Sequence, residues 1–196
     1  MIHLLPHWNV ESFGEPVRVW AYTNCPEAEL FLNGVSLGRR AVEAWGHAEW
    51  LVEYEAGRLE AVGYGADGQA VTSDVKETTG APVALRLRLE NEVKTVADVA
   101  IVTCYAVDEE GRTVPDACPT VEFYTNELGR ILGTGSDVCD HTPLNSPIRK
   151  MREGAIGVAV GVSSLKGTIL QRSGVVELYA KAEGLRGAKL TYTLEE

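Results

Sequence analysis

Apolar and polar residues alternate along short segments of the chain, and the clearest example lies between residues 17 and 38. Residues 17–23 place Val, Val, Ala and Thr on one face and Arg, Trp and Tyr on the other. After a turn at 24–26, a second alternating run over 27–33 ends in Asn33-Gly34. Asn-Gly is the dipeptide that best fits a type I′ hairpin turn. The pattern therefore predicts a strand, a turn, a second strand and a hairpin into a third strand.

The same alternation fills the first part of the chain, whereas helical spacing of apolar residues is almost absent. Strands are predicted at 2–8, 17–23, 27–33, 35–42, 48–54, 58–64 and 69–78. About seven short strands in roughly 80 residues is the size of an immunoglobulin-like β-sandwich.

A turn-rich joint, Thr78–Pro82, predicts a domain boundary, so that residues 1–80 form one domain and residues 81–196 the next. Segment Ser136–Lys150 is rich in turn formers and is expected to be irregular. The remaining alternating segments predict strands at 83–89, 99–107, 121–125, 130–133, 154–163, 175–182 and 189–194. The predicted fold class is all-β, with two tandem immunoglobulin-like β-sandwiches.

The net charge of the chain limits which classes of macromolecule are expected to bind it. The chain has 18 Lys and Arg against 28 Asp and Glu, a net charge of −10. Neither nucleic acid nor an anionic membrane is expected as a partner, because phosphate contacts need a basic patch. No apolar run approaches the roughly 18–20 residues of a membrane span. The first ten residues lack the positive flank, apolar core and cleavage site of a signal peptide.

The four cysteines show no CxxC spacing and allow three disulfide pairings; they are Cys25, Cys104, Cys118 and Cys139. Cys104 lies in an apolar segment, where a buried thiol is expected. Without an export signal, free thiols and a cytoplasmic location are favoured, while a secreted or periplasmic parent protein stays open.

Four segments, in order, resemble one enzyme family: HLLPHWN at 3–9, YTNC with ELFLNG and SLG within 22–38, LEAVGYGADGQAV at 59–71, and DEEGRTVPDA with GRILGTGS within 108–136. Together they resemble the C-terminal region of glycoside hydrolase family 2 enzymes of the β-galactosidase type. Val10 departs from this pattern, where the family often has an aromatic residue, and so does Ser136-Asp137, where it often has an Asn-Gly-Asp turn.

The resemblance implies a multidomain retaining β-glycosidase, whose acid/base and nucleophile are two glutamates in a (β/α)8 barrel. This chain would then be the trailing β-sandwich domains of such an enzyme, without the barrel. The catalytic barrel of the same parent chain is the partner that the resemblance implies.

The residues themselves predict no catalytic site. A retaining glycosidase needs two carboxyl groups about 5–5.5 Å apart, one of them with a raised pKa. Glu53 and Glu55 flank Tyr54 on an expected strand and could lie close together. Alternation instead predicts a solvated face or a turn for these and for most other acidic residues, among them Glu29, Glu49, Glu60, Asp108 and Glu109. No barrel pattern accompanies them.

Asp137, Cys139, Asp140 and His141 are metal-capable residues at short spacing. Zinc sites need two separated pairs of ligands, and calcium needs more oxygen ligands in a loop of defined geometry. A loop built on turn-forming Asp residues is therefore predicted, with no metal and no cofactor.

The candidate carbohydrate-binding residues are Trp45, Trp50 and Trp8, since exposed aromatic rings stack on sugar rings. For Trp50, packing in the core or between domains is favoured, because large aromatic residues dominate cores. Trp45 lies beside Gly46 in an expected loop and is the strongest candidate for an exposed platform. Trp8 is expected to face the barrel and to leave an exposed apolar patch on this chain.

The first hypothesis is therefore a pair of non-catalytic domains that support the barrel, shape the outer substrate surface or mediate oligomer contacts. Two alternatives stay open. One is a carbohydrate-binding module with an oligosaccharide as partner, and the other is a free-standing adhesion or interaction module.

Overall fold

The computed structural model of this chain describes residues 1–10, 14–137, 139–165, 168–169 and 173–195. Within these residues the chain is all-β and contains no helix, which confirms the predicted fold class. Accordingly, none of the described segments forms a helix that could cross a membrane. The chain divides into two compact units, Met1–Thr79 and Gly80–Glu196.

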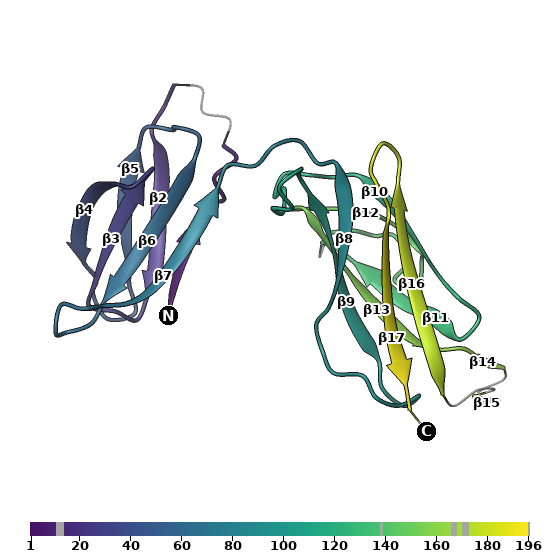
Figure 1. The fold of residues 1–196 in the computed structure, drawn as a ribbon. Coiled ribbons are helices and arrows are strands. Elements are labelled where there is room, and N and C mark those ends of the chain that lie inside the picture. Colours follow the sequence, from purple (N-terminus) through teal and green to yellow (C-terminus); the bar gives the residue numbers. More distant parts are fainter. Residues whose placement is uncertain (11–13, 138, 166–167, 170–172, 196) are drawn as a thin grey trace. The chain divides into compact units, whose positions relative to one another are not determined.

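The first unit consists of two antiparallel sheets, one with strand order β1-β2-β5 and the other with order β4-β3-β6-β7 (Figure 1). Its strands are β1 (Ile2–Leu5), β2 (Val17–Thr23), β3 (Glu27–Leu32), β4 (Val35–Ala41), β5 (His47–Val52), β6 (Arg58–Tyr64) and β7 (Ala70–Glu77). The predicted hairpin is confirmed between β3 and β4, because Asn33 and Gly34 both have positive φ, at 50° and 82°.

The core of the first unit lies between its two sheets and contains the inward-facing residue of each pleat. Leu4 and Val19 enter from the first sheet, and Leu30 and Leu59 from the second. Trp8 follows β1 and fills this core with no exposed surface. Its Nε1 donates a hydrogen bond to Glu55 O at 2.9 Å, and its ring centroid lies 5.1 Å from that of Tyr54.

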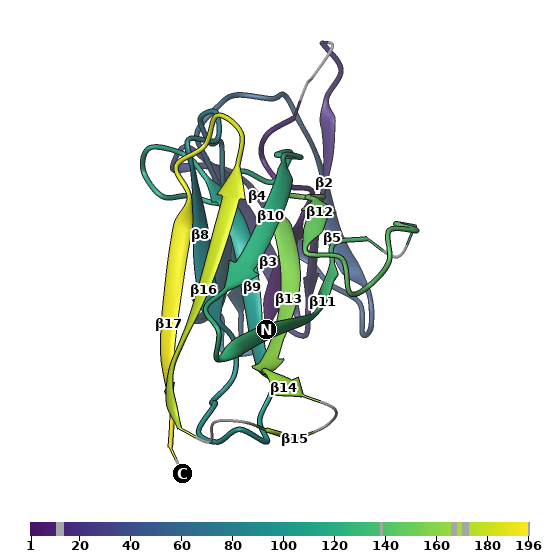
Figure 2. The same cartoon turned by 90° about the vertical axis from the view of Figure 1, so that its right-hand side faces the viewer.

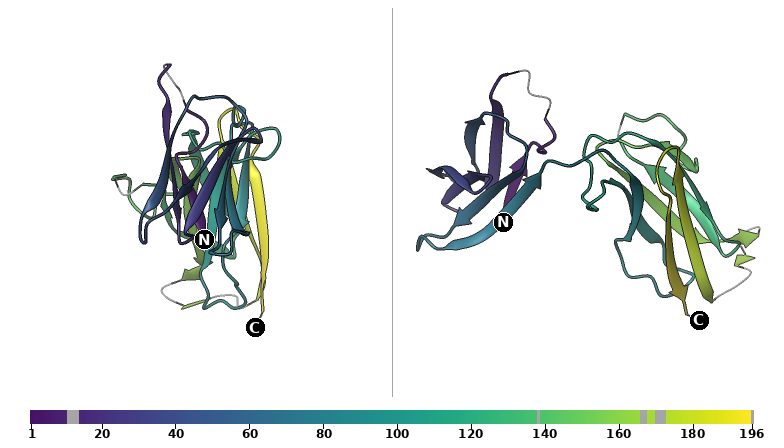
Figure 3. Two further views of the ribbon diagram at one scale, coloured as in Figure 1. Left: turned by 90° about the vertical axis from the view of Figure 1, so that its left-hand side faces the viewer. Right: turned by 45° about the horizontal axis from the view of Figure 1, so that its top comes forward.

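The second unit repeats this design with the sheets β11-β13-β9-β8 and β12-β10-β16-β17, and β14 and β15 pair separately. Strands β17, β16 and β10 lie side by side in Figure 2, and Figure 3 gives further views of the layers. The strands are β8 (Ala84–Leu89), β9 (Ala100–Val107), β10 (Thr120–Thr125), β11 (Gly129–Gly135), β12 (Ile148–Lys150), β13 (Ala155–Val162), β14 (Ser164–Leu165), β15 (Thr168–Ile169), β16 (Gly174–Ala182) and β17 (Ala188–Leu194).

The core of the second unit joins Val102 and Ile156 of one sheet to Phe123 and Leu178 of the other. Cys104 lies in this core, as the sequence predicted, and burial raises the pKa of its thiol to about 12. All four cysteines are free thiols in this structure.

Asp108 corrects an expectation, because it was expected to be solvated and is instead buried. It accepts hydrogen bonds from Arg112 N at 2.8 Å, from Arg112 Nε at 2.9 Å and from Gly80 N at 3.1 Å. Burial alone would raise the pKa of the Asp108 carboxyl, but these donors outweigh it and the pKa is lowered. The acidic turn after β9 is therefore fixed to its own unit by the buried Asp108 carboxylate, which pairs with the partly exposed Arg112.

We predict that Trp8→Ala lowers the free energy of unfolding of the first unit by about 3–5 kcal/mol, because it removes a large buried ring and leaves a cavity. Trp45→Ala is the matched control, with an expected change within about 0.5 kcal/mol. Urea titration followed by tryptophan fluorescence measures both, since every tryptophan of the chain lies in residues 1–79. Equal losses in the two variants would contradict this account of the core.

Candidate functional site

Trp45 lies fully exposed in the loop between β4 and β5. It occupies the second central position of a turn that Gly46 N closes on Glu43 O at 2.9 Å. Its φ of +67° falls in the left-handed region, which bulky residues seldom adopt. The predicted loop position and exposure of Trp45 are thus observed, while sugar binding by Trp45 stays a prediction.

A pocket of 540 Å³ lies between this loop and the turn that joins β2 to β3. We call it the Trp45 pocket; it is lined by Met1, Tyr22, Thr23, Asn24, Cys25, Pro26, Val42, Glu43, Ala44, Trp45 and Gly46. Its volume falls in the range of small-ligand sites, roughly 300–1,000 Å³.

An aromatic row continues from this pocket across the outer face of the sheet β1-β2-β5. Tyr22, which lines the pocket, has its ring centroid 5.1 Å from His47, and His47 lies 5.4 Å from Trp20. Trp20 Nε1 donates to Glu49 Oε2 at 2.7 Å. The three rings come from neighbouring strands, because Tyr22 pairs with His47 and Trp20 with Glu49 in the β2–β5 register.

Trp50 and Trp8 are buried, so neither ring offers a face to a sugar in this structure. Trp50 packs in the core, as favoured from the sequence, and its Nε1 donates to Gly38 O at 3.1 Å. Trp8 corrects an expectation, because it turns inward instead of forming an exposed apolar patch. Of the three candidate residues, only Trp45 has an accessible ring.

Glu53 and Glu55 were the two carboxyl groups expected to lie close together on one strand. Strand β5 ends at Val52, so Glu53 and Glu55 do not share the strand face that was expected. Glu55 is exposed and accepts a hydrogen bond from Asn33 Nδ2 at 3.0 Å. Where the pKa of a described carboxyl group is shifted, it is lowered, whereas a general acid needs a raised one; these groups are Glu29, Glu90, Asp98, Asp108, Asp140 and Glu177.

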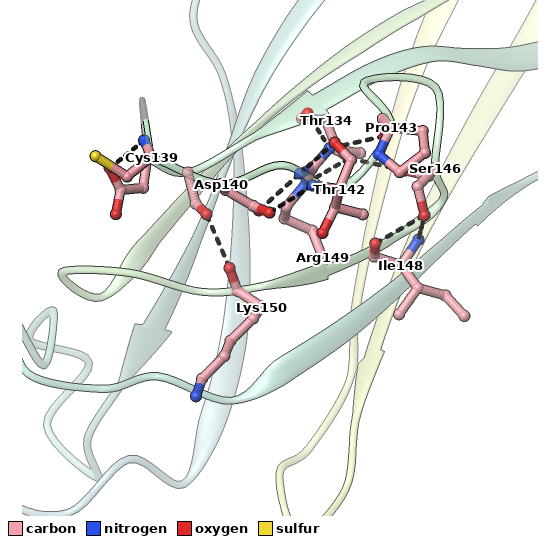
Figure 4. A network of polar contacts seen from close by, with 11 residues as sticks. Thr134, Cys139, Asp140, Thr142, Pro143, Ser146, Ile148, Arg149 and Lys150 are labelled. Carbon is pink, nitrogen blue, oxygen red and sulfur yellow. Dashed lines mark hydrogen bonds and ion pairs between the residues drawn. The ribbon is translucent and has the colours of Figure 1, made fainter.

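The loop between β11 and β12 is held by Arg149, whose side chain is only 1% exposed. Figure 4 shows its guanidinium among loop oxygens. Arg149 Nη1 lies 2.6 Å from Asp140 Oδ2, and Nη2 donates to Thr134 O at 2.8 Å and to Pro143 O at 3.0 Å. The hydrogen bond from Arg149 holds the pKa of the Asp140 carboxyl well below its usual value.

The same loop carries the metal-capable residues noted in the sequence. Asp137 Oδ1 accepts a hydrogen bond from Cys139 N at 2.9 Å, which is the turn geometry expected of Asp. Asp140 pairs with Arg149, and Cys139 and His141 are exposed. In the part of the chain that the structure describes, no three metal-capable side chains come together.

A second hollow, of 470 Å³, lies where Gly135 of β11 pairs with Gly157 of β13. We call it the glycine hollow; it is lined by Gly135, Ser136, Asp137, Arg152, Glu153, Ala155 and Gly157. A Cβ atom built at Gly135 meets nothing within 4 Å, and one at Gly157 meets only Gly135 O at 3.6 Å. The unit itself therefore has room for side chains here, and glycine inside a strand often marks close approach by another group.

Comparison with known proteins assigns both units. Residues 14–72 match "Domain of unknown function (DUF4982)", and residues 85–191 match "Glycoside hydrolase family 2 C-terminal domain 5". The chain belongs to glycoside hydrolase family 2. This confirms the resemblance to the C-terminal region of family 2 enzymes.

Relatives in family 2 are much longer than this chain. It is 31% identical over its whole length to the β-galactosidase BoGH2A of Bacteroides ovatus, of which it covers 23%. It is 42% identical over 59% of its length to a putative β-glucuronidase of Formosa agariphila, of which it covers 12%. The solved β-glycosidase of Bacteroides vulgatus superposes on 97% of this chain with a TM-score of 0.86 and 27% identity, and the chain covers 24% of it. The chain therefore spans about a quarter or less of these relatives.

Sequence reasoning in this family 2 chain did not single out Arg149, the aromatic row or the glycine pair. Arg149 gives no periodic signal, because β12 has only three residues and the partners of Arg149 lie in β11 and in the loop that follows it. Alternation already placed Trp20 and Tyr22 on one face of β2, and that signal could have found the aromatic row. Gly157 lies inside the strand predicted at 154–163 and was an equally available signal, whereas Gly135 lies beyond the strand predicted at 130–133.

We predict that the acid stability of the second unit depends on Asp140. Since its folded pKa is lowered, its stabilising effect is present above the unfolded pKa of about 4 and is lost as the pH falls through the folded value. Asp140→Asn should therefore unfold at lower urea than the wild type at pH 7. The difference should begin to shrink below about pH 4 and disappear only when the pH falls below the folded pKa of Asp140.

Far-UV circular dichroism measures this difference across the pH range. Tryptophan fluorescence is the internal control and should not change, because every tryptophan lies in the first unit. A difference between the two proteins that does not shrink as the pH falls from about 4 toward the folded pKa of Asp140 would rule out the ion pair as its source.

Proposed function

We propose that this chain is the non-catalytic C-terminal accessory region of a retaining β-glycosidase. The observation that carries the proposal is the extent of the match: the whole chain aligns with only 23% of the β-galactosidase of Bacteroides ovatus. The matched family model describes a C-terminal domain. The lowered carboxyl pKa values also support a non-catalytic role, because they reflect hydrogen-bonded, ionised groups rather than a general acid.

For the complete enzyme, we propose β-galactosides as the substrate class, because a relative that is 31% identical over the whole chain is named a β-galactosidase. β-Glucuronides are the second candidate, because a relative with 42% identity over 59% of the chain is named a putative β-glucuronidase, and a relative with 29% identity over 97% of the chain is named a β-glucuronidase. The residues that choose between these sugars would lie in the catalytic barrel.

We further propose that the second unit docks on the catalytic portion of its own enzyme through the glycine hollow. The pair Gly135 and Gly157 leaves the backbone bare on the outer face of β11 and β13. Ile101, which pairs with Ala159 of β13, is 44% exposed, and Leu144 of the Arg149-anchored loop is 75% exposed. Bare backbone flanked by exposed apolar side chains suits a closely packed protein surface. About three quarters of an enzyme like the Bacteroides ovatus relative lies outside this chain and can supply that surface.

We predict that the purified chain does not hydrolyse aryl β-galactosides or aryl β-glucuronides, whereas the complete enzyme hydrolyses one of them. Release of the aryl group, followed by absorbance, measures both activities. Turnover by the chain that is abolished when one of its own glutamates is replaced would overturn the non-catalytic role.

We also predict that Gly135→Val lowers the temperature at which the complete enzyme loses activity, because it weakens the docking of the second unit. The valine has room within the unit and favours a strand, so the isolated chain should keep its urea midpoint. Thr191→Val, on exposed β17, is the matched control and should change neither property. If the complete enzyme carrying Gly135→Val loses activity at the same temperature as the wild type, the glycine hollow is not part of the docking surface.

A further inference from the structure

Trp45 combines two features that the stability of its own unit does not explain. Its ring is fully exposed, and its backbone adopts the left-handed conformation that a glycine or asparagine would occupy with less strain. Among the described residues, no ring contact or hydrogen bond involves the indole. Strained residues cluster at sites where a ligand or a partner gives them a role.

The Trp45 pocket combines apolar surface with polar groups that have no partner among the described residues. Pro26, Val42 and the Trp45 ring supply apolar surface. The indole N–H of Trp45 is a donor, the Glu43 carboxylate is an acceptor, and the Tyr22 hydroxyl can do both. A few polar groups in a mainly apolar pocket are typical of small-ligand sites.

We propose that the Trp45 pocket binds a neutral saccharide. A pyranose ring has an apolar face of C–H bonds, which fits against a flat indole, and a rim of hydroxyl groups, which both donate and accept hydrogen bonds. Trp45 would stack on the sugar face, while Glu43 and Tyr22 bond to its hydroxyl groups. The aromatic row of Tyr22, His47 and Trp20 continues from the pocket and would contact further sugar units of a longer chain.

The overall charge of the chain favours neutral sugars over uronic acids. The pocket lining contains the Glu43 carboxylate and the N-terminal ammonium of Met1, which bonds to Asn24 Oδ1, so the net charge of −10 on the chain is what disfavours a sugar carboxylate. This binding role goes beyond the proposed accessory role and does not depend on it, because it is measured on this chain without catalysis.

The test is titration of the purified chain with xylo-oligosaccharides and galacto-oligosaccharides, followed by tryptophan fluorescence and by calorimetry. We expect saturable binding of at least one neutral series, with weaker binding of an oligoglucuronate of equal length. Trp45→Gly should weaken this binding by about tenfold or more, because a stacked aromatic residue carries much of the energy of such a site. Glu43→Gln should reduce the discrimination against the oligoglucuronate.

Trp45→Gly also separates a loss of binding from a loss of folding. Glycine adopts a positive φ without strain, so this variant should have a urea midpoint that is unchanged or higher. Val71→Ala, an exposed apolar position outside the pocket, is the matched control and should bind as the wild type does. The proposal is overturned by the absence of saturable binding to every neutral series, or by binding that Trp45→Gly leaves intact.

Discussion

Both units depend on one constraint, the burial of every second side chain between two sheets. In the first unit, Leu30 and Leu59 face inward while their chain neighbours Glu29 and Glu60 face outward. Phe123 holds the equivalent inward position in β10 of the second unit. Because the side-chain period of a strand is two, a slip of one residue would bring the whole core face to solvent. The register of each sheet, and with it the position of every loop, follows from this requirement.

Local patterns along the chain were therefore sufficient to predict most of the strands. The segment expected at 17–23 is the observed β2, and the Asn33-Gly34 turn forms where the dipeptide placed it. The strand expected at 48–54 instead ends at Val52. Tyr54 leaves the alternation because its ring packs on Trp8, a contact between segments that no local pattern encodes.

The burial of Asp108 and Arg149 could not be predicted from the sequence either, because it also depends on contacts between separate segments. Asp108 was expected in a solvated turn, but three donors from Arg112 and Gly80 make its burial favourable. Arg149 is buried because the carbonyl oxygens of Thr134 in β11 and of Pro143 in the loop converge on it. In both cases the residue type was known from the sequence, whereas the partners that decide its environment are set only by the folded loop.

The features that suggest function are those that burial and pairing within a unit leave unexplained. Trp8 and Trp50 fill the core of the first unit, so their conformations need no further cause. Trp45 contributes nothing to that core, and its backbone has a strained positive φ. Gly135 and Gly157 have no side chains, although the second unit has room for side chains at both positions. Trp45 adds exposed aromatic surface, which suits a ligand that stacks on it. Gly135 and Gly157 leave bare backbone, which suits a closely packed protein surface. The two units therefore point to different kinds of contact.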